Sequence, residues 1–542
     1  MTDYISPISI KDARIENITD TLKYPIYSGS GLNSYYQYAS TSANNNQIIF
    51  NCQIPSENTL IDRNVLINAT YKIVLTIRNI TAGSTAFNYG LGECFQAFPI
   101  HSSIKNMTCS INNTSFSINT QNVIQQLLKL IEPREFQRYN GMTPTLCDLY
   151  FNNYTDAIGS KGDITGDYKD ASYDNQLVPR GAHPLKSITV LHNKTAGGTD
   201  TSLVSTNIND IWTITLESEF TEPLLLSPFL FHSKHNFNNQ SIYGIQSINL
   251  NINLDTSLKR FFTSNNNDIS IAFDTTNPIT NAKLLFNFLN IQETDKIPSR
   301  NIVPYVDYPT YISSDSDIIN ANQSKSINSQ NYQLNQVPDL FIICVRRPMA
   351  SMTIKNTNSF LPIRNISINF NNKSGLLSSA TVQDLYRLSK INGSVQSWYE
   401  FFGYAGKANS NPANTALSQY LYTTTGSLIV INPTKDLGLP YYLSNGSIGN
   451  FNIQFKIDVI NNTNDNFVPE IVIITPNSGF MINDRGLTEI YTGILSKEIV
   501  VETNLKLSSI PSINNTPLIG SGLDKEQGIK KKLSVLDDLL SS

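Results

Sequence analysis

Short segments in which apolar and polar residues alternate recur along most of the chain, separated by clusters of Asn, Gly, Ser and Pro. Residues 47–54 (QIIFNCQI) and 65–78 (VLINATYKIVLTIR) are typical, because both are rich in β-branched side chains. Alternation of this kind predicts β-strands with one buried face. Residues 107–118 (MTCSINNTSFSI) predict a hairpin, since Asn112 and Asn113 can adopt the positive φ that a tight turn requires.

Helical spacing of apolar residues is rare and first appears directly after this hairpin. From Val123 to Ile131, apolar residues recur every three to four positions. Thr120 is a suitable N-cap, and Pro133 is expected to end the helix.

The second half of the chain repeats the strand and helix pattern of the first half in the same order. An Asn-, Ser- and Ile-rich sequence aligns with itself easily by chance, but the shared order of four segments favours a tandem duplication. The first two segments, the hairpin and the helix, lie together in 99–131 and correspond to 362–391. The other two are 214–229, which corresponds to 428–444, and 243–254, which corresponds to 448–459.

The pattern predicts an all-β chain of two tandem eight-stranded antiparallel jelly rolls with a few short helices. Many short strands with turn signals favour a sandwich of two antiparallel sheets over a barrel, and over a parallel sheet in which helices alternate with strands. The expected division is an N-terminal arm at 1–45, jelly roll 1 at 46–272, jelly roll 2 at 273–508, and a flexible linker with an amphipathic tail at 509–542.

Four segments define the expected second copy. A strand at 282–291 is predicted to open it, and a strand at 499–505 is predicted to close it. The polar stretch 293–338 has the composition of a long surface loop. The unbroken apolar run within 339–347 (DLFIICVRR) predicts a strand that is buried on both faces.

Composition and charge narrow the function. Only 15% of the 542 residues are charged and the formal net charge is -4, so no basic footprint for sequence-specific nucleic-acid binding is expected. The start of the chain has no signal-peptide pattern and no apolar run approaches the length of a membrane helix, which predicts synthesis in the cytosol. Five cysteines without Cys-x-x-Cys spacing are interpreted as buried free thiols, namely Cys52, Cys94, Cys109, Cys147 and Cys344.

Motifs for catalysis, cofactors or metals are absent or weak, and we predict no enzyme and no cofactor. His232 and His235 have no nearby third ligand, so a surface pair is favoured over a metal site. Residues 403–407 (GYAGK) lack the spacing of a phosphate-binding loop. Trp212 and Trp398 lie beside apolar runs, which favours core packing over sugar stacking.

Several segments together resemble a known family. They are FPIHSS and NNTSFSINT, the run YDNQLVPRGAHP, and EPLLLSPF ahead of the strand YGIQSINLNINL. In this order they resemble double jelly-roll major capsid proteins, above all those of Polinton-like viruses and virophages, within the lineage that includes adenovirus hexon. The resemblance covers about residues 45–505.

This resemblance implies a structural protein of the virion. The implied unit is a homotrimeric, pseudo-hexameric capsomer of an icosahedral DNA virus shell, made in the host cytosol and assembled intracellularly. The implied partners are other copies of the chain, neighbouring capsomers, penton proteins and minor capsid proteins. The family's outward tower loops would correspond to residues 137–182 and 394–425.

The tail carries one sharper signal. It resembles the pattern cut by adenovirus-type maturation proteases and consists of Leu518, Ile519, Gly520, Ser521 and Gly522. A viral protease is therefore a candidate partner, and Ser521–Gly522 is the bond that it is expected to cut. The alternative interpretation of this glycine-rich segment is a hinge.

Beyond the expected cleavage bond, an apolar stripe at helical spacing predicts a docking helix for a scaffold, a membrane or the genome inside the shell. Its apolar positions are Ile529, Leu533, Leu536 and Leu540.

A sugar-binding or adhesive β-sandwich surface protein is the main alternative function. The missing signal-peptide pattern and the odd number of cysteines oppose it. A carbohydrate-active enzyme is a third interpretation, weakened because no loop-borne pair of carboxylates can be located.

Overall fold

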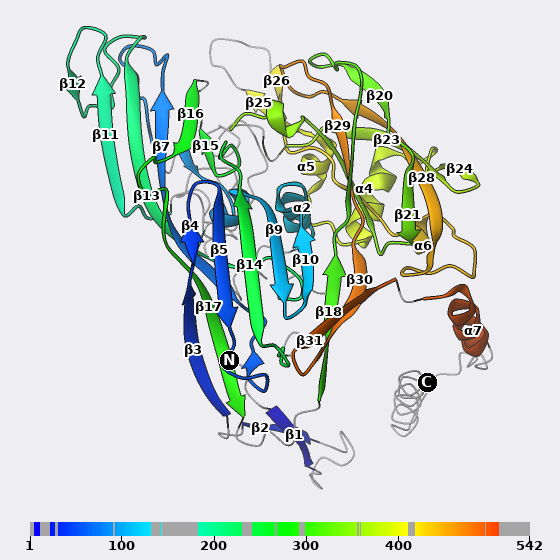
Figure 1. Cartoon of the computed structure of the whole chain (residues 1–542). Helices are drawn as coiled ribbons and strands as arrows, with labels where there is room; N and C mark the ends of the chain where they lie inside the picture. The colour runs from blue at the N-terminus through cyan, green and yellow to red at the C-terminus, as the bar shows by residue number, and fades with distance from the viewer. Residues whose placement is uncertain are drawn as a thin grey trace. The chain divides into compact units, whose positions relative to one another are not determined.

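The computed structural model divides into two compact units, residues 1–495 and residues 496–542. The following ranges are described: 5–10, 22–27, 31–89, 93–131, 142–143, 183–229, 241–264, 266, 268–291, 299–354, 357, 359–409, 418–493 and 495–508. The first unit consists mainly of antiparallel strands (Figure 1). Within the ranges given above, no helix is both long and apolar enough to cross a membrane.

The first half of the larger unit is a sandwich of two antiparallel sheets. One has the order β10-β9-β14-β5-β4, and Figure 1 shows β5, β14, β9 and β10 side by side. The other has the order β12-β11-β13-β7-β17-β3, with β16 added to β7 and β6 to β17. A small pair, β8 (Glu93–Phe95) with β15 (Phe262–Ser264), lies outside these sheets.

The bounds of the five-stranded sheet are β4 (Ser42–Ala43), β5 (Gln47–Gln53), β9 (Ile104–Ile111), β10 (Thr114–Ile118) and β14 (Ser247–Leu254). Those of the larger sheet are β3 (Gly31–Ala39), β6 (Leu60–Ile61), β7 (Leu66–Ile77), β11 (Ser187–Asn193), β12 (Thr199–Asp200), β13 (Ile211–Pro223), β16 (Ile269–Phe273) and β17 (Ile279–Ile291).

The predicted alternation explains how these sheets pack. Along β7 and β13, every second side chain is buried, and Ile73 and Leu216 pair across the two strands in the core. Phe50 of β5 and Leu250 of β14 pair in the same way in the facing sheet. Each such side chain contributes about 1.5–3 kcal/mol by leaving water, so the two inner faces hold the sandwich together.

The second half repeats this plan. One sheet has the order β20-β28-β23-β24, with β21 added to β28, and the other has the order β19-β29-β22-β27. The bounds are β19 (Thr310–Ser314), β20 (Ser324–Asn328), β21 (Tyr332–Gln336), β22 (Phe341–Arg346), β23 (Ile363–Phe370), β24 (Lys373–Leu376), β27 (Ile429–Ile431), β28 (Ile448–Ile460) and β29 (Glu470–Ile474).

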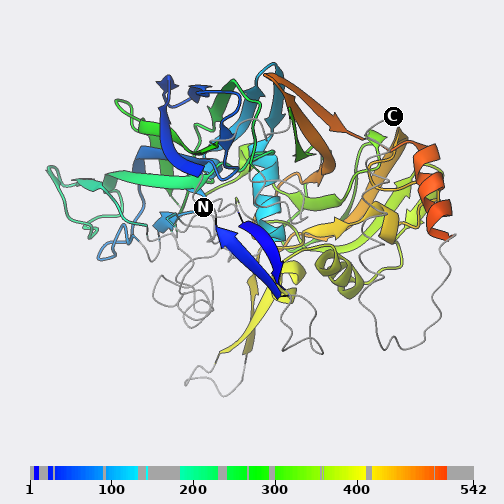
Figure 2. The same ribbon diagram turned by 90° about the horizontal axis from the view of Figure 1, so that it is seen from below.

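Two smaller sheets complete the second half. A three-stranded sheet has the order β18 (Arg300–Asp307), β30 (Asn477–Asp484) and β31 (Leu487–Thr492). The pair β25 (Tyr404–Asn409) and β26 (Ser418–Thr423) leaves the end of α5 (Trp398–Phe402) as a two-stranded ribbon, yellow in Figure 2. Near the N-terminus, β1 (Ile5–Ile10) pairs with β2 (Leu22–Tyr27).

The hairpin and helix that suggested a duplication are present in both halves. The hairpin β9–β10 is followed by α2 (Thr120–Leu127), and β23–β24 is followed by α4 (Val382–Ile391). Asn112 and Asn371 take equivalent turn positions, each with a φ of 50°. Asn113 is not among the positive-φ residues, so the expectation for Asn112 alone is confirmed.

Within the described residues of the larger unit, the remaining helical segments are short. Besides α5 they are α1 (Pro99–Ser102), α6 (Pro433–Asp436) and the 3₁₀ turns Leu128–Leu130 and Met349–Ser351. The N-cap of α2 is Asn119 rather than the predicted Thr120, which is already helical and buried. In the second copy, Thr381 caps α4 in a capping box with Asp384.

Several predicted boundaries are wrong because strand pairing between distant segments decides them. The strand expected to open the second copy is β17, which pairs with β7 and β3 of the first half instead. Thus the first sandwich extends beyond residue 272 to Ile291, and β3 within the expected arm is one of its strands. Residues 293–338 are not simply a surface loop, because β18 to β21 lie within them.

The smaller unit contains α7 (Lys497–Ser508) where a strand was expected at 499–505. Its β-branched residues suggested a strand, but Ser496 accepts a hydrogen bond from the amide of Ile499, and Glu498 lies in the first turn. Both features favour a helix N-terminus.

Other expectations are confirmed. All residues of β22 are buried, and Trp212 lies in the core, whereas Trp398 is half-buried against Tyr386 and Phe402. Four cysteines are buried free thiols, namely Cys52, Cys94, Cys109 and Cys344. Cys147 lies outside the described residues.

Candidate functional site

The predicted cleavage residues Leu518, Gly520, Ser521 and Gly522 lie outside the described residues. The same holds for His232 and His235, and for the expected tower segment 137–182 apart from residues 142–143. Across the described ranges, no group of three or more His, Cys, Asp or Glu side chains is placed to hold a metal ion. The candidate sites are therefore polar clusters inside the larger unit.

The first cluster brings together two motifs of the family resemblance. Glu222, from EPLLLSPF, lies at the end of β13 and points to α1, which contains the Pro-Ile-His of FPIHSS. Its carboxylate accepts hydrogen bonds from the backbone amides of Ile100 (2.7 Å) and His101 (3.1 Å). It also lies 2.6 Å from Nδ1 of His101, and neither side chain is exposed to solvent.

The contacts of His101 fix the tautomer of its ring. Nε2 lies 3.1 Å from the backbone amide of Leu225, which can only donate, so Nε2 must accept that hydrogen bond. The proton is then on Nδ1, which donates to Glu222. The carboxylate of Glu222 thus binds both the backbone and the side chain at the start of α1. These hydrogen bonds hold the start of α1 against the end of β13.

The rest of the EPLLLSPF motif contacts β18, in the second half. The hydroxyl of Ser227 accepts a hydrogen bond from the backbone amide of Val306 at 2.9 Å. Nε of Arg63 donates to the carbonyl of Pro228 at 2.8 Å, and its Nη2 lies 3.4 Å from the carbonyl of Pro304. This motif therefore links the two halves of the chain.

A buried ion pair marks a second contact between the halves. Nε of Arg346, on β22, lies 2.7 Å from Oε1 of Glu470 on β29, and both side chains are almost fully buried. The guanidinium also donates to the side-chain oxygen of Asn122 on α2, in the first half. Because removing one partner of such a pair leaves a buried charge, the junction depends on all three residues.

The end of the same helical segment carries a buried amine at the junction. The carbonyl of Lys129 accepts a hydrogen bond from the amide of Val395 at 2.9 Å, which joins the two halves by their backbones. Nζ of Lys129 lies 5.8 Å from the centroid of the Phe360 ring. Burial raises the pKa of Glu400, while the positive charge of Lys129 acts in the opposite direction.

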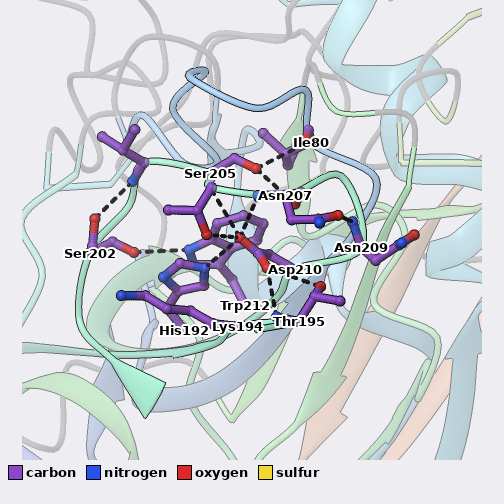
Figure 3. A network of polar contacts seen from close by, with 12 residues as sticks. Ile80, His192, Lys194, Thr195, Ser202, Ser205, Asn207, Asn209, Asp210 and Trp212 are labelled. Atoms are coloured by element: carbon purple, nitrogen blue, oxygen red, sulfur yellow. Dashed lines mark hydrogen bonds and ion pairs between the residues drawn. The ribbon is translucent and has the colours of Figure 1, made fainter. Parts of the chain in front are cut away.

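A third cluster surrounds Asp210 at the end of the β11–β13 sheet (Figure 3). Its fully buried carboxylate accepts hydrogen bonds from the amides of Thr195, Thr206 and Asn207 at 2.8–3.0 Å, and from both threonine hydroxyls. Burial would raise the pKa of Asp210, but these hydrogen bonds outweigh it and lower the pKa below its ordinary value.

His192 lies between two carboxylates in this cluster. Nδ1 is 2.7 Å from Oδ1 of Asp200, and Nε2 is 3.2 Å from Oδ2 of Asp210. The imidazole stacks on Trp212 with ring centroids 4.4 Å apart and an angle of 8° between the planes. Lys194 forms an ion pair with Asp200 at 2.5 Å and lowers the pKa of that carboxyl.

The hydrogen bonds of these clusters hold backbone segments in place. The carboxylates around His192 lie on opposite edges of its ring, so they do not converge on a common point where a metal or substrate would bind. The Asp210 cluster instead fixes the loop between β11 and β13. Sequence reasoning identified Trp212 as a core residue but missed His192 and Asp210, whose only signal is the turn-forming sequence before Asp210.

Comparisons with known proteins agree with this structural role. The family model of the Sputnik virophage major capsid protein 1st domain matches residues 3–289, and that of the major capsid protein V20 C-terminal domain matches residues 308–479. The chain is 25% identical over 516 residues to the putative capsid protein V20 of Sputnik virophage, covering 92% of this chain and 82% of that protein.

Two solved structures share the fold. A chain in the 3.5 Å cryo-EM structure of the Sputnik virophage gives a TM-score of 0.75 at 23% identity, covering 96% of this chain and 98% of that one. The mavirus major capsid protein gives a TM-score of 0.66 at 14% identity, covering 90% and 93%. The two sandwiches are thus a double jelly roll. With one family model matching more than half of its length, the chain belongs to the Sputnik virophage major capsid protein family.

Proposed function

We propose that this chain assembles as a homotrimer into pseudo-hexameric capsomers of an icosahedral DNA virus shell. The observation that carries the proposal is the pair of similar sandwiches within one chain, joined by the buried contacts of Arg346, Asn122 and Glu470. A closed three-fold ring of such chains has six similar edges, whereas a ring of single sandwiches has three. The duplication therefore lets three chains occupy a site with six neighbours.

The partners follow from this role. Each capsomer contacts further copies of the chain, together with penton and minor capsid proteins at special positions of the shell. The protein is made in the host cytosol, assembled inside the cell, and acts as a building block rather than a catalyst. The ribbon β25–β26, within the expected tower segment 394–425, would face outward.

Electron microscopy of the purified protein tests this proposal. Particles with a hexagonal outline and three-fold averages are expected. Single elongated particles of one chain, at all protein concentrations, would contradict the proposal.

The tail adds a proposal on maturation. A viral protease would cut Ser521–Gly522 within the Leu518 to Gly522 segment, and the apolar stripe after it would dock inside the shell before cleavage. The intact mass of the protein from virions decides this, because a chain that still ends at Ser542 would exclude the cut. A Gly520→Asp variant should retain its full length when it is co-expressed with the protease.

A further inference from the structure

The three-stranded sheet β18–β30–β31 has two faces of different character. Its inner face contacts the first half: Thr488 binds Asn112 through its hydroxyl (2.9 Å) and Asn113 through its amide (2.8 Å). The rings of Tyr305 and Phe116 meet edge to face at 5.7 Å. Met481, between them in the sheet, is fully buried. This face is part of the junction between the two jelly rolls.

The outer face carries six apolar and three charged residues, and all of them are at least partly exposed. Strand register aligns its residues in three cross-strand rows, which are Pro304–Phe480–Tyr491, Ile302–Ile482–Glu489 and Arg300–Asp484–Leu487. Leu487 is 63% exposed and Tyr491 is 41% exposed, and the Tyr491 ring stacks on Phe480 with centroids 5.3 Å apart. Isolated exposed apolar residues are common, but six apolar residues side by side on one sheet face are typical of an interaction site.

The charges around this face balance. Nε of Arg300 lies 3.1 Å from Oδ2 of Asp484, and the hydroxyl of Tyr491 donates to Glu489. With Arg485 in the adjoining turn, two positive residues balance the two negative ones, Asp484 and Glu489. Nucleic acid and anionic lipid surfaces require an excess of Lys or Arg, which this face lacks. Aromatic and aliphatic residues with a balanced polar rim fit another protein surface.

We propose that a neighbouring copy of this chain in the same trimer packs on the outer face of β18–β30–β31. This inference rests on the proposed function and names one of its contact surfaces. Two observations select a second copy as the occupant: the charge balance, and the continuity of this sheet with the junction between the two jelly rolls. The neighbour presents a different surface, because a closed three-fold ring is built from heterologous contacts.

The size of the face defines its part in the contact. Its three most exposed apolar side chains, Leu487, Tyr491 and Ile302, are 40–63% exposed, which is too little surface for the about 800 Å² that a stable interface buries on each partner. The face is therefore the centre of the contact and not the whole of it. Residues at such centres contribute most to affinity, which makes them the right positions to change.

A matched pair of double variants tests the proposal. Leu487→Lys with Tyr491→Lys changes the face, and Ile391→Lys with Tyr441→Lys changes residues that are 73% and 75% exposed elsewhere. Mass photometry of the full chain measures the trimer fraction against concentration. We expect roughly 100-fold weaker self-association for the first double variant and less than about threefold for the second. Equal melting temperatures of the monomers show that both double variants fold.

A photo-cross-linking amino acid in place of Tyr491 gives an independent measurement. Cross-links to a second copy are expected, and mass spectrometry locates the partner segment. If the unmodified chain forms trimers while the double variant of Leu487 and Tyr491 associates equally well, or if position 491 cross-links only within its own chain, this inference is wrong and the proposed function stands. If the unmodified chain is a monomer, the proposed function itself is wrong.

Discussion

The buried contact between Glu222 and His101 leads to a prediction for the change Glu222→Gln. The carboxylate accepts three hydrogen bonds, from the amides of Ile100 and His101 and from the His101 ring. A glutamine oxygen can accept from an amide, but its nitrogen must then face a second donor. The ring cannot relieve this by moving its proton, because Nε2 would then oppose the amide of Leu225.

The magnitude follows from burial and charge. Both side chains are fully buried, so the unmatched donors cannot turn to water. An unsatisfied buried polar group costs about 1–3 kcal/mol, and a hydrogen bond to a charged group contributes about 1.5–3 kcal/mol. We therefore expect Glu222→Gln to lower the free energy of unfolding by about 3 kcal/mol.

Glu219→Gln is the matched control, because Glu219 lies on the same strand and pairs with Lys186 at 2.6 Å with both side chains 42% exposed. An exposed pair of this kind contributes about 1 kcal/mol or less. Urea unfolding at fixed protein concentration compares the two variants, and hydrogen exchange at Ile100 and His101 reports the site itself. A Glu222→Gln variant within about 0.5 kcal/mol of the control, with unchanged exchange, would refute the account of this cluster.

Three further predictions concern other described residues. Arg346→Met leaves Glu470 buried without its partner and should cost about 3 kcal/mol in urea unfolding, whereas Arg300→Met on the surface should cost less than about 1 kcal/mol. Because the pKa of Asp210 is lowered in the folded protein, its carboxylate stabilises the fold fully above the ordinary carboxyl pKa, and this stability is lost only as the pH falls through the folded-state pKa. Hydrogen exchange at the Thr206 amide should therefore stay slow at pH 4 in the unmodified protein. In Asp210→Asn it should be fast at the same pH. Burial raises the pKa of the Cys344 thiol to about 11, so iodoacetamide at pH 8 should modify it only after unfolding, and rapid native modification would contradict this burial.

Local patterns in the sequence determine much of the fold. Alternation predicted strands such as β7 and β13, and the turn at Asn112 followed by helical spacing predicted the hairpin and α2. The corresponding elements β23–β24 and α4 then gave the duplication. These features depend on neighbouring residues, so one sequence suffices to find them.

Long-range pairing explains the errors. Nothing within residues 282–291 says that β17 pairs with β3, about 250 residues earlier, and so the boundary between the halves was misplaced. The polar composition around β18 hid its alternation of exposed Ile302 with buried Val303. In α7, β-branched residues favoured a strand although capping favours a helix.

The sequence revealed the motifs that contain some of these polar residues, but not the contacts between them. FPIHSS and EPLLLSPF carried the family resemblance, but the contact of His101 with Glu222 joins positions 121 residues apart. Likewise, Asp210 and His192 are recognisable only once β11 and β13 are paired. Which residues meet is decided by tertiary packing, and a single sequence does not encode it in any local pattern.

The claim that supports the proposed function is that three copies of this chain form a closed trimer with two jelly rolls in each subunit. Multi-angle light scattering of the purified protein measures the mass of the assembly. We predict one species at three times the chain mass of 60.4 kDa, unchanged over about a hundredfold dilution. A single species at 60.4 kDa that stays monomeric at the highest concentration would contradict the claim.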